Sequence, residues 1–153
     1  MSAQTITLVL ETDIRGSAEA VFDTIVDLRG YGRWLGSSTA YAGTTEISSD
    51  PVTAGTTYVE PSSSGVRRGT VTELERPARV TFHQPMSMSP GFLGVIDIHV
   101  TYTLTPAAEG VHVRRVVSLD LGWPLRLLRP VVVPRFRSEN ERTMQALKAF
   151  VEG

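Results

Sequence analysis

PRFRSENERTMQALKAFVE (residues 134–152) is the longest helical pattern in this chain, and the architecture follows from what such a helix has to cover. Apolar and small polar residues recur along it every three or four positions, as on one face of an α-helix. That face comprises Phe136, Asn140, Thr143, Met144, Leu147, Phe150 and Val151. Pro134 suits a helix start and Gly153 a helix end. The pattern predicts a helix over residues 135–151, about 25 Å long.

The residues before this helix are mainly strand-like segments joined by short turns. Alternating or β-branched residues predict strands over 5–14, 55–60, 66–75, 79–84, 95–105 and 111–121, with a weaker candidate at 40–48. Ser17 and the apolar spacing after it predict a short amphipathic helix ending near Gly30, followed by one helical turn at 31–34. Residues 85–94 predict a loop. Residues 125–129 begin a helix that prolines interrupt before residue 135.

This order of elements predicts an α+β fold with a cavity. Strands joined by short turns pair antiparallel. Seven strands span roughly 30 Å when flat, whereas one helix is only ~10–12 Å across. We therefore expect a curved antiparallel sheet of about seven strands wrapped around the C-terminal helix, with two short helices after the first strand. Space between the helix and the sheet should hold a small molecule.

Composition excludes several classes of protein. The net charge of −1 provides no basic field for nucleic acid, and without cysteine there are no disulfides or thiolate sites. No apolar run reaches the ~20 residues of a membrane span, and the N-terminus lacks a signal-peptide pattern. We expect one domain over residues 1–153, located in the cytoplasm, as a monomer or a homodimer.

Several motifs are similar to a known family. The segment Ser17–Asp23 with the aromatic turn after it, the run Gly69–Phe82 with its proline turn, and the stretch Tyr102–Pro106 resemble the START-like (SRPBCC) superfamily, specifically its polyketide cyclase/dehydrase branch. The resemblance covers nearly the whole chain and implies a helix-grip fold, so that residues 1–153 would form one START-like ligand-binding domain. It also implies a pocket between sheet and helix for hydrophobic or amphipathic molecules. The same fold serves cyclases and carriers, so the fold alone does not decide the chemistry.

We expect the ligand to contact inward-facing aromatic, aliphatic and polar side chains. The predicted ligand-binding residues are Tyr31, Trp34, Tyr58, Phe82, Phe92, Ile98, Tyr102, Arg115, Phe136, Asn140 and Met144. For Tyr31 and Trp34 the alternative is an aromatic plug between the sheet and the first helix. Phe92 belongs to the loop 85–94, whose methionines suit an adaptable lid over the pocket or a permanently packed loop.

Arg115 is the strongest candidate for polar chemistry. It shares the strand phase of Val113 and Val117, so its charge points inward and requires a partner. It either binds an acidic or carbonyl group of a ligand, pairs structurally with Glu60, Glu73 or Asp97, or lies at the open end of the sheet. Asn140 either caps backbone groups or contacts a ligand. With Tyr58, these two residues are the candidates for a catalytic role in cyclisation.

The three histidines give no metal site on sequence spacing alone. Asp97 and His99 lie two apart on one strand and share a face, but that face is opposite the apolar one. His83 is also out of phase with its apolar neighbours. We therefore expect solvent-facing positions, no metal and no other cofactor.

The sequence is compatible with three functions. The first is binding of a hydrophobic or amphipathic, lipid-like or polyketide-like molecule without turnover. The second is a cyclase, aromatase or dehydratase that needs no metal or redox cofactor. The third is a protein–protein interaction module that uses the apolar segment around Trp123 and residues 125–133.

Overall fold

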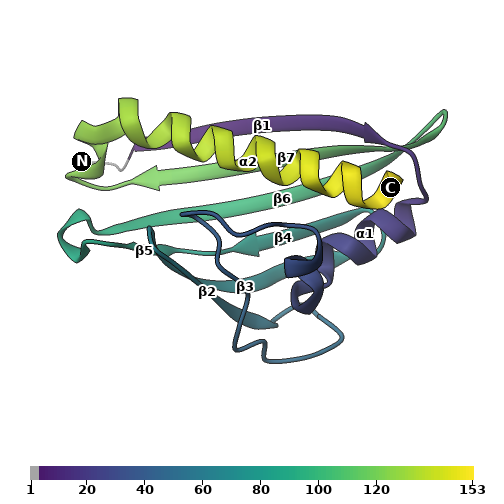
Figure 1. The fold of residues 1–153 in the computed structure, drawn as a ribbon, viewed down its shortest axis with the longest axis horizontal. Helices are drawn as coiled ribbons and strands as arrows, with labels where there is room; N and C mark the ends of the chain where they lie inside the picture. Colours follow the sequence, from purple (N-terminus) through teal and green to yellow (C-terminus); the bar gives the residue numbers. More distant parts are fainter. Residues whose placement is uncertain (1–3) are drawn as a thin grey trace.

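A long C-terminal helix lies across one face of a seven-stranded antiparallel sheet (Figure 1). The computed structural model describes residues 4–153. The sheet order is β1-β7-β6-β4-β3-β2, and β5 pairs with both β3 and β6. The predicted α+β helix-grip fold with a curved antiparallel sheet is confirmed.

The strands and helices follow the predicted order. The strands are β1 (Gln4–Ile14), β2 (Thr57–Ser62), β3 (Gly65–Glu75), β4 (Arg79–His83), β5 (Met86–Met88), β6 (Val95–Ala107) and β7 (Gly110–Leu121). The helices are α1 (Ala18–Val26), the 3-10 turns η1 (Leu28–Arg33), η2 (Gly91–Leu93) and η3 (Leu125–Leu128), and α2 (Arg129–Glu152). In this arrangement α1 and η1 are the two short helices expected after the first strand.

Strand alternation separates the two faces of the sheet. On β6, the even-numbered residues from Ile96 to Leu104 are almost fully buried, whereas Asp97 and His99 between them are partly or well exposed. Leu119 and Leu121 on the adjacent β7 are fully buried and pair with Ile98 and Ile96. The inner face therefore carries the apolar core, and the outer face is polar.

The first helix begins where the sequence indicates. The side chain of Ser17 accepts a hydrogen bond from the Ala20 backbone N–H at 3.0 Å, which caps α1. Four apolar residues of this helix are buried, namely Val21, Phe22, Ile25 and Val26. Asp27 ends α1 and caps η1 by accepting from the Gly30 N–H at 3.2 Å. These local signals place η1, and with it Tyr31, at the edge of the inner face.

The closing helix differs from the prediction at its start. It is continuous from Arg129, so Pro130 and Pro134 neither interrupt it nor delay it to residue 135. Pro130 occupies the first turn, where a missing N–H costs nothing. Pro134 then lacks only the bond that it would donate to the carbonyl of Pro130. At the other end Phe150 is 44% exposed, so the buried face is narrower than its apolar pattern suggests.

Two further segments differ from the sequence-based expectation. Residues 40–48 form a loop with a single bridge between Thr45 and Val59 rather than a strand. The predicted loop 85–94 contains β5 and η2, because Met86 and Ser87 pair with both neighbouring strands. Across residues 4–153, no helix combines the length and hydropathy needed to cross a membrane. The prediction that the N-terminus carries no signal peptide falls partly on residues 1–3, which lie outside the described residues.

Candidate functional site: a cavity between the sheet and the closing helix

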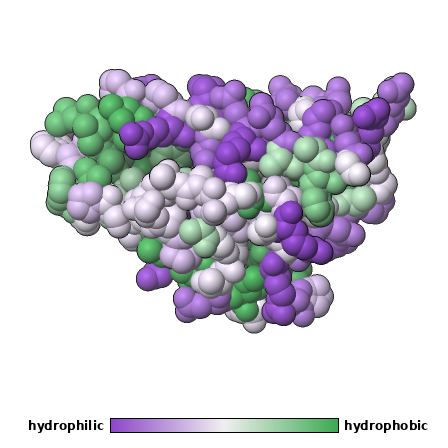
Figure 2. All heavy atoms as spheres, viewed as in Figure 1, coloured by the Kyte–Doolittle hydropathy of each residue, from purple (hydrophilic) through white to green (hydrophobic). Residues whose placement is uncertain are grey.

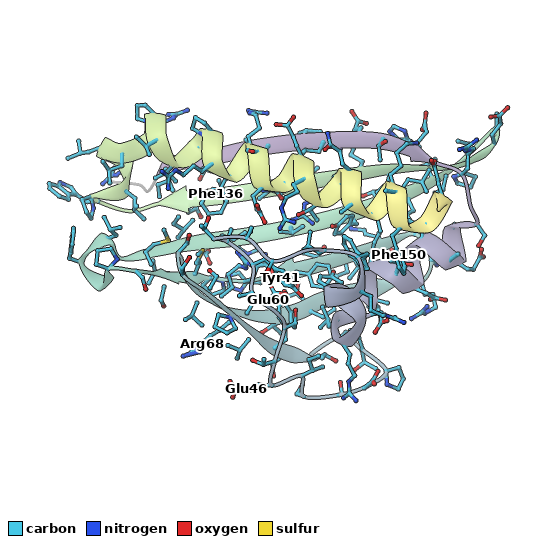
Figure 3. The ribbon with its side chains drawn as sticks, viewed as in Figure 1. Tyr41, Glu46, Glu60, Arg68, Phe136 and Phe150 are labelled. Carbon is cyan, nitrogen blue, oxygen red and sulfur yellow. The ribbon has the colours of Figure 1, made fainter. Side chains whose placement is uncertain are left out.

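A cavity of about 800 Å³ lies between the inner face of the sheet and α2. Its volume is in the range of pockets that enclose drug-sized ligands. The second half of α2 packs on the core through residues such as Met144 and Leu147, whereas its first half borders the cavity. Figure 3 shows Phe136 on α2 on one side of this region, with Tyr41 and Glu60 on the other.

The cavity wall is largely apolar and aromatic. Tyr58, Phe82 and Tyr102 form a row of edge-to-face contacts, with centroid distances of 6.2 and 6.4 Å. The aliphatic part of the wall comprises Leu35, Met86, Met88, Leu93, Ile98, Val100, Val117, Leu125, Leu128, Val131 and Val132. Such a lining suits an apolar guest, because it combines rigid aromatic rings with flexible methionines.

Arg115 projects from β7 into this apolar surround. Its guanidinium lies 5.0 Å from the ring centre of Tyr102, the residue directly opposite it on β6. Its Nε donates to Asn140 Oδ1 at 2.8 Å, and one Nη donates to the Tyr102 hydroxyl. Asn140 in turn donates to the Phe136 carbonyl at 2.7 Å, which fixes its amide. Both side chains that hold the Arg115 charge are therefore neutral.

No carboxylate of residues 4–153 lies within ion-pair distance of Arg115. The predicted structural alternatives are all engaged elsewhere. Glu60 pairs with Arg67, Glu73 pairs with Arg79, and Asp97 contacts histidines on the outer face. A partly buried cation held only by neutral groups favours binding of a negatively charged or strongly polarised oxygen.

A second arginine in the wall is neutralised by the protein itself. Arg67 on β3 lies opposite Glu60 on β2, and their side chains are only 11% and 6% exposed. Arg67 Nε donates to Glu60 Oε1 at 3.2 Å, and its Nη2 donates to the Ala40 carbonyl at 2.7 Å. Thr44 donates to the other carboxylate oxygen at 2.7 Å. This network ties the 40–44 loop to the sheet.

Two cavity tyrosines, Tyr31 and Tyr58, are hydrogen-bond donors at neutral pH. Burial raises the pKa of Tyr31 well above its ordinary value, and the neighbouring Tyr102 and Glu60 raise it further. Burial, followed by the Glu60 charge, likewise raises the pKa of Tyr58. Tyr58 donates to Gln84 Oε1 at 2.6 Å, and Tyr31 donates to the Ile25 carbonyl. Neither phenol therefore serves as a base near neutral pH.

The cavity reaches the surface at the start of α2. Leu128 and Val131 line it, yet they are 41% and 54% exposed. Figure 2 shows hydrophobic residues gathered at this end of the molecule, over η3 and the first turns of α2. Leu93 of η2 lines the same cavity. An apolar molecule can therefore enter here over exposed aliphatic side chains, with Arg135 also on the cavity wall.

The sequence matches the protein family described as polyketide cyclase / dehydrase and lipid transport over residues 5–152. The chain belongs to this family. The match spans almost all of the 153 residues, in agreement with the START-like resemblance found from the motifs. Comparison with curated proteins finds no significant match.

Solved structures similar to this family member share its fold at low sequence identity. Norcoclaurine synthase from Thalictrum flavum superimposes with a TM-score of 0.74 at 13% identity, over 99% of this chain and 96% of that one. The di-domain ARO/CYC StfQ from the steffimycin biosynthetic pathway gives 0.73 at 10% identity, over 97% of this chain and 51% of that one. The Mll3558 protein from Rhizobium loti gives 0.72 at 20% identity, over 97% and 99%. These likenesses establish the fold.

The structure brings most of the predicted ligand-binding residues of this cyclase/dehydrase-family chain to the cavity. Those in the wall are Tyr31, Tyr58, Phe82, Ile98, Tyr102, Arg115, Phe136 and Asn140. Three others are not among the lining residues. Trp34 packs edge-on against Tyr31 at 5.1 Å behind the wall, Phe92 is 77% exposed on η2, and Met144 faces β1 beside Val9 and Leu10.

These three displacements have simple causes. A 3-10 turn presents only one of its three residues inward, and in η2 that residue is Leu93 rather than Phe92. Met144 is one turn past Asn140, where α2 has already closed onto the core. Sequence reasoning did not assign Glu60 and Arg67 to the cavity. Glu60 could have been placed inward because it has the same strand phase as Tyr58. Its partner Arg67 could be identified only from the β2–β3 register.

Proposed function

We propose that the cavity binds an amphipathic small molecule that is mostly apolar and carries an anionic or carbonyl oxygen at one end. The apolar body would lie against Phe82, Val100 and Phe136, and the oxygen would accept hydrogen bonds from Arg115. The observation that carries this proposal is the Arg115 guanidinium, which faces the cavity with only neutral partners among the described residues. A ligand oxygen would supply the counter-charge that the protein leaves out.

The experiment uses two adjacent arginines of β7 as a matched pair. Arg115 points into the cavity, whereas Arg114 has a side chain that is 51% exposed on the outer face. Fluorescence titration with 1-anilinonaphthalene-8-sulfonate, an apolar anion, should give saturable binding to the wild type. Arg115→Gln should weaken it by about tenfold or more, since hydrogen bonds to charged groups contribute ~1.5–3 kcal/mol. Arg114→Gln should bind like the wild type.

Two outcomes would reject the proposal. One is equal loss of affinity in both variants, which would mean that the probe responds to overall charge. The other is unchanged affinity in Arg115→Gln, which would remove Arg115 from the site. Nile red, a neutral apolar probe, supplies the remaining control, because its affinity should be the same in all three proteins.

A second candidate is cyclisation of a bound polyketone, as the family description and the likeness to an ARO/CYC protein suggest. Arg115 would stabilise the enolate oxygen that forms when a proton leaves the carbon between two carbonyls. That proton would pass to solvent water. The enolate carbon would then attack a second carbonyl, whose oxygen would take up a proton, and the new hydroxyl would leave as water together with a hydrogen from the neighbouring carbon. Tyr58 could hold the acceptor carbonyl as a hydrogen-bond donor.

Binding is the favoured reading because a base is not evident in the wall. Glu60 lines the cavity, but its two carboxylate oxygens already accept hydrogen bonds from Arg67 and Thr44, so neither is free to take a substrate proton. Incubation with a linear poly-β-ketone, followed by mass spectrometry, separates the two candidates. Loss of 18 mass units faster than in buffer, and slowed in Arg115→Gln, supports cyclisation. Intact bound ketone supports binding alone.

A further inference from the structure

Three side chains with metal-binding chemistry meet on the outer face of the sheet, away from the cavity. His83 on β4 lies directly opposite His99 on β6 in the strand register. Asp97 precedes His99 by two residues on β6 and therefore projects from the same face. The side chains of His83, Asp97 and His99 are 37%, 40% and 46% exposed, so solvent ions can reach all three.

The ligand atoms of these residues already converge. His83 Nε2 lies 2.6 Å from Asp97 Oδ1, and His99 Nδ1 lies 3.9 Å from Asp97 Oδ2. The two imidazole rings stack with a centroid distance of 4.2 Å and an angle of 9° between their planes. One atom from each residue can be chosen so that all three lie within 4.8 Å of one another. The parallel rings thus present nitrogens on the side where the carboxylate sits.

This spacing is close to what a tetrahedral ion requires. With bonds of ~2.0–2.2 Å to nitrogen and oxygen, neighbouring ligand atoms around a tetrahedral zinc ion are about 3.3 Å apart. The separations of 2.6 and 3.9 Å bracket that value. The two separations involve different oxygens of Asp97. Because a metal ion lies in the plane of each imidazole that binds it, the stacked rings must also rotate out of their parallel arrangement, and the half-exposed positions leave room for such rotations. The strands themselves need not move.

We propose that His83, Asp97 and His99 bind a divalent transition-metal ion of the zinc class, with water completing the coordination. Two imidazoles and one carboxylate suit zinc, nickel and copper, whereas magnesium and calcium prefer oxygen ligands only. The sequence placed His83, Asp97 and His99 on the solvent side and predicted no metal, because spacing along the chain did not bring His83 beside the other two. The third ligand comes from a neighbouring strand, and only the β4–β6 pairing reveals it.

The surroundings also favour a cation. Asp97 lies directly opposite Asp120 on β7, and both belong to the outward phase of their strands. Like charges directly opposite each other on a sheet are destabilising, and a bound cation offsets that repulsion. The ion would tie β4 to β6 at the point where Phe82 and Val100, one residue further along, pair on the cavity side. It would therefore brace the back of the cavity wall.

The chain offers its own matched control. His112 on β7 contacts Glu11 at 3.0 Å and Asp13 at 2.7 Å, so it too is a histidine beside carboxylates on a partly exposed strand. Among the described residues, the group whose ligand atoms converge consists of His83, Asp97 and His99, and His112 is not part of it. A probe that merely responds to histidines near carboxylates would not distinguish the two places.

Isothermal titration of the full chain, with any tag removed and metals stripped by chelation, tests the proposal with zinc chloride. We expect one Zn²⁺ per chain and no heat with magnesium chloride. His83→Gln, His99→Gln and Asp97→Asn should each weaken binding more than tenfold, since even outer-shell changes at metal sites cost 10–100-fold. His112→Gln should bind like the wild type. Zinc at 100 times its dissociation constant should raise the Tm by about 5–10 °C.

Imidazole NMR resonances of the wild type provide a readout that needs no variant. Added Zn²⁺ should shift the signals of His83 and His99 and leave those of His112 in place. Absence of zinc binding would overturn the proposal, as would binding that survives both His83→Gln and His99→Gln or that depends on His112. Because the cavity lies on the other face, either result leaves the ligand-binding proposal to its own test.

Discussion

Arg67 and Arg115 are two cations in the wall of one cavity, and they differ in the charge of their hydrogen-bond partners. Arg67 has the carboxylate of Glu60 within 3.2 Å and the Ala40 carbonyl within 2.7 Å. Arg115 is held by the Asn140 amide and the Tyr102 hydroxyl, which are both neutral. One charge is therefore satisfied inside the protein, and the other retains most of its attraction for an anion.

The difference separates a structural charge from a functional one. A buried ion pair contributes little net stability but is costly to break. The pair of Arg67 and Glu60 therefore holds β2, β3 and the 40–44 loop together. A partly buried cation without a carboxylate lowers the free energy of unfolding, so its presence in the cavity wall favours a role in ligand binding. Burial of an arginine is thus not itself a sign of function, whereas burial without a counter-ion is.

The largest expected effect follows from breaking the Arg67 pair. Glu60→Gln should lower the free energy of unfolding by about 3–5 kcal/mol, because it leaves an uncompensated charge at a site where both side chains are nearly buried. Urea denaturation measures this. Glu75→Gln, at an exposed position on β3, is the control and should change stability by less than about 0.5 kcal/mol.

A double variant sharpens the same test. Glu60→Leu combined with Arg67→Met removes both charges and should recover most of the stability lost in Glu60→Gln. If Glu60→Gln alone lowers the free energy of unfolding by less than about 1 kcal/mol, the pair does not hold the strands and the loop together, and the contrast with Arg115 loses its basis.

A smaller effect is expected from giving Arg115 the kind of partner that Arg67 has. Asn140→Asp places a carboxylate where the amide oxygen now accepts from Arg115 at 2.8 Å. Affinity for 1-anilinonaphthalene-8-sulfonate should fall by about tenfold or more, equivalent to ~1.4 kcal/mol, because the cation is then neutralised internally. Nile red affinity should not change. Unchanged binding of the anion would show that the state of Arg115 does not control the site.

The smallest expected effect on stability concerns Glu139, a cavity-lining carboxylate that accepts hydrogen bonds from Arg142 and Ser38. Burial alone would raise the pKa of Glu139, but hydrogen bonds from Arg142 at 2.6 Å and Ser38 at 3.0 Å outweigh it and lower the pKa. A lowered folded-state pKa gives stability above the ordinary value of 4.5 that is lost as the pH falls through the folded-state value.

Acid titration of stability therefore tests this group. Because the Arg142 side chain is 34% exposed, the contribution should stay below about 1 kcal/mol. Glu139→Gln should be less stable than the wild type at neutral pH and should converge with it below pH 4.5. Curves that stay parallel through this range would show that Glu139 does not titrate against Arg142 and Ser38. Glu141→Gln, exposed on the same helix, provides the control.

Most of the fold could be predicted because its signals are local. Alternation identified β6 and β7, Ser17 marked the start of α1, and the apolar spacing identified the closing helix. The predicted start of α2 was wrong because prolines were expected to interrupt the helix. Early in a helix, a proline removes a backbone hydrogen bond that is missing or weak there anyway, so the helix continues through it. The short strand β5 was missed because its residues form a strand through pairing with β3 and β6 rather than through their own β-propensity.

The site could be predicted only where a residue's own strand reveals its direction. The phase of Arg115 relative to Val113 and Val117 was sufficient to place it inward. Its partners were not predictable, since Tyr102 and Asn140 reach it through the β6–β7 register and the docking of α2. The pairing of Glu60 with Arg67 and of His83 with His99 has the same origin, because strand register is a property of two segments together.

Calorimetric affinities of dodecanoate and dodecan-1-ol test the central claim most directly, because the two share one apolar chain and differ only in the charged head. We expect dodecanoate to bind the wild type at least about tenfold more tightly than dodecan-1-ol. This preference should disappear in Arg115→Gln, and dodecan-1-ol should bind both proteins equally. Equal affinity of the two ligands for the wild type, or a preference for the acid that persists in Arg115→Gln, would contradict the central claim.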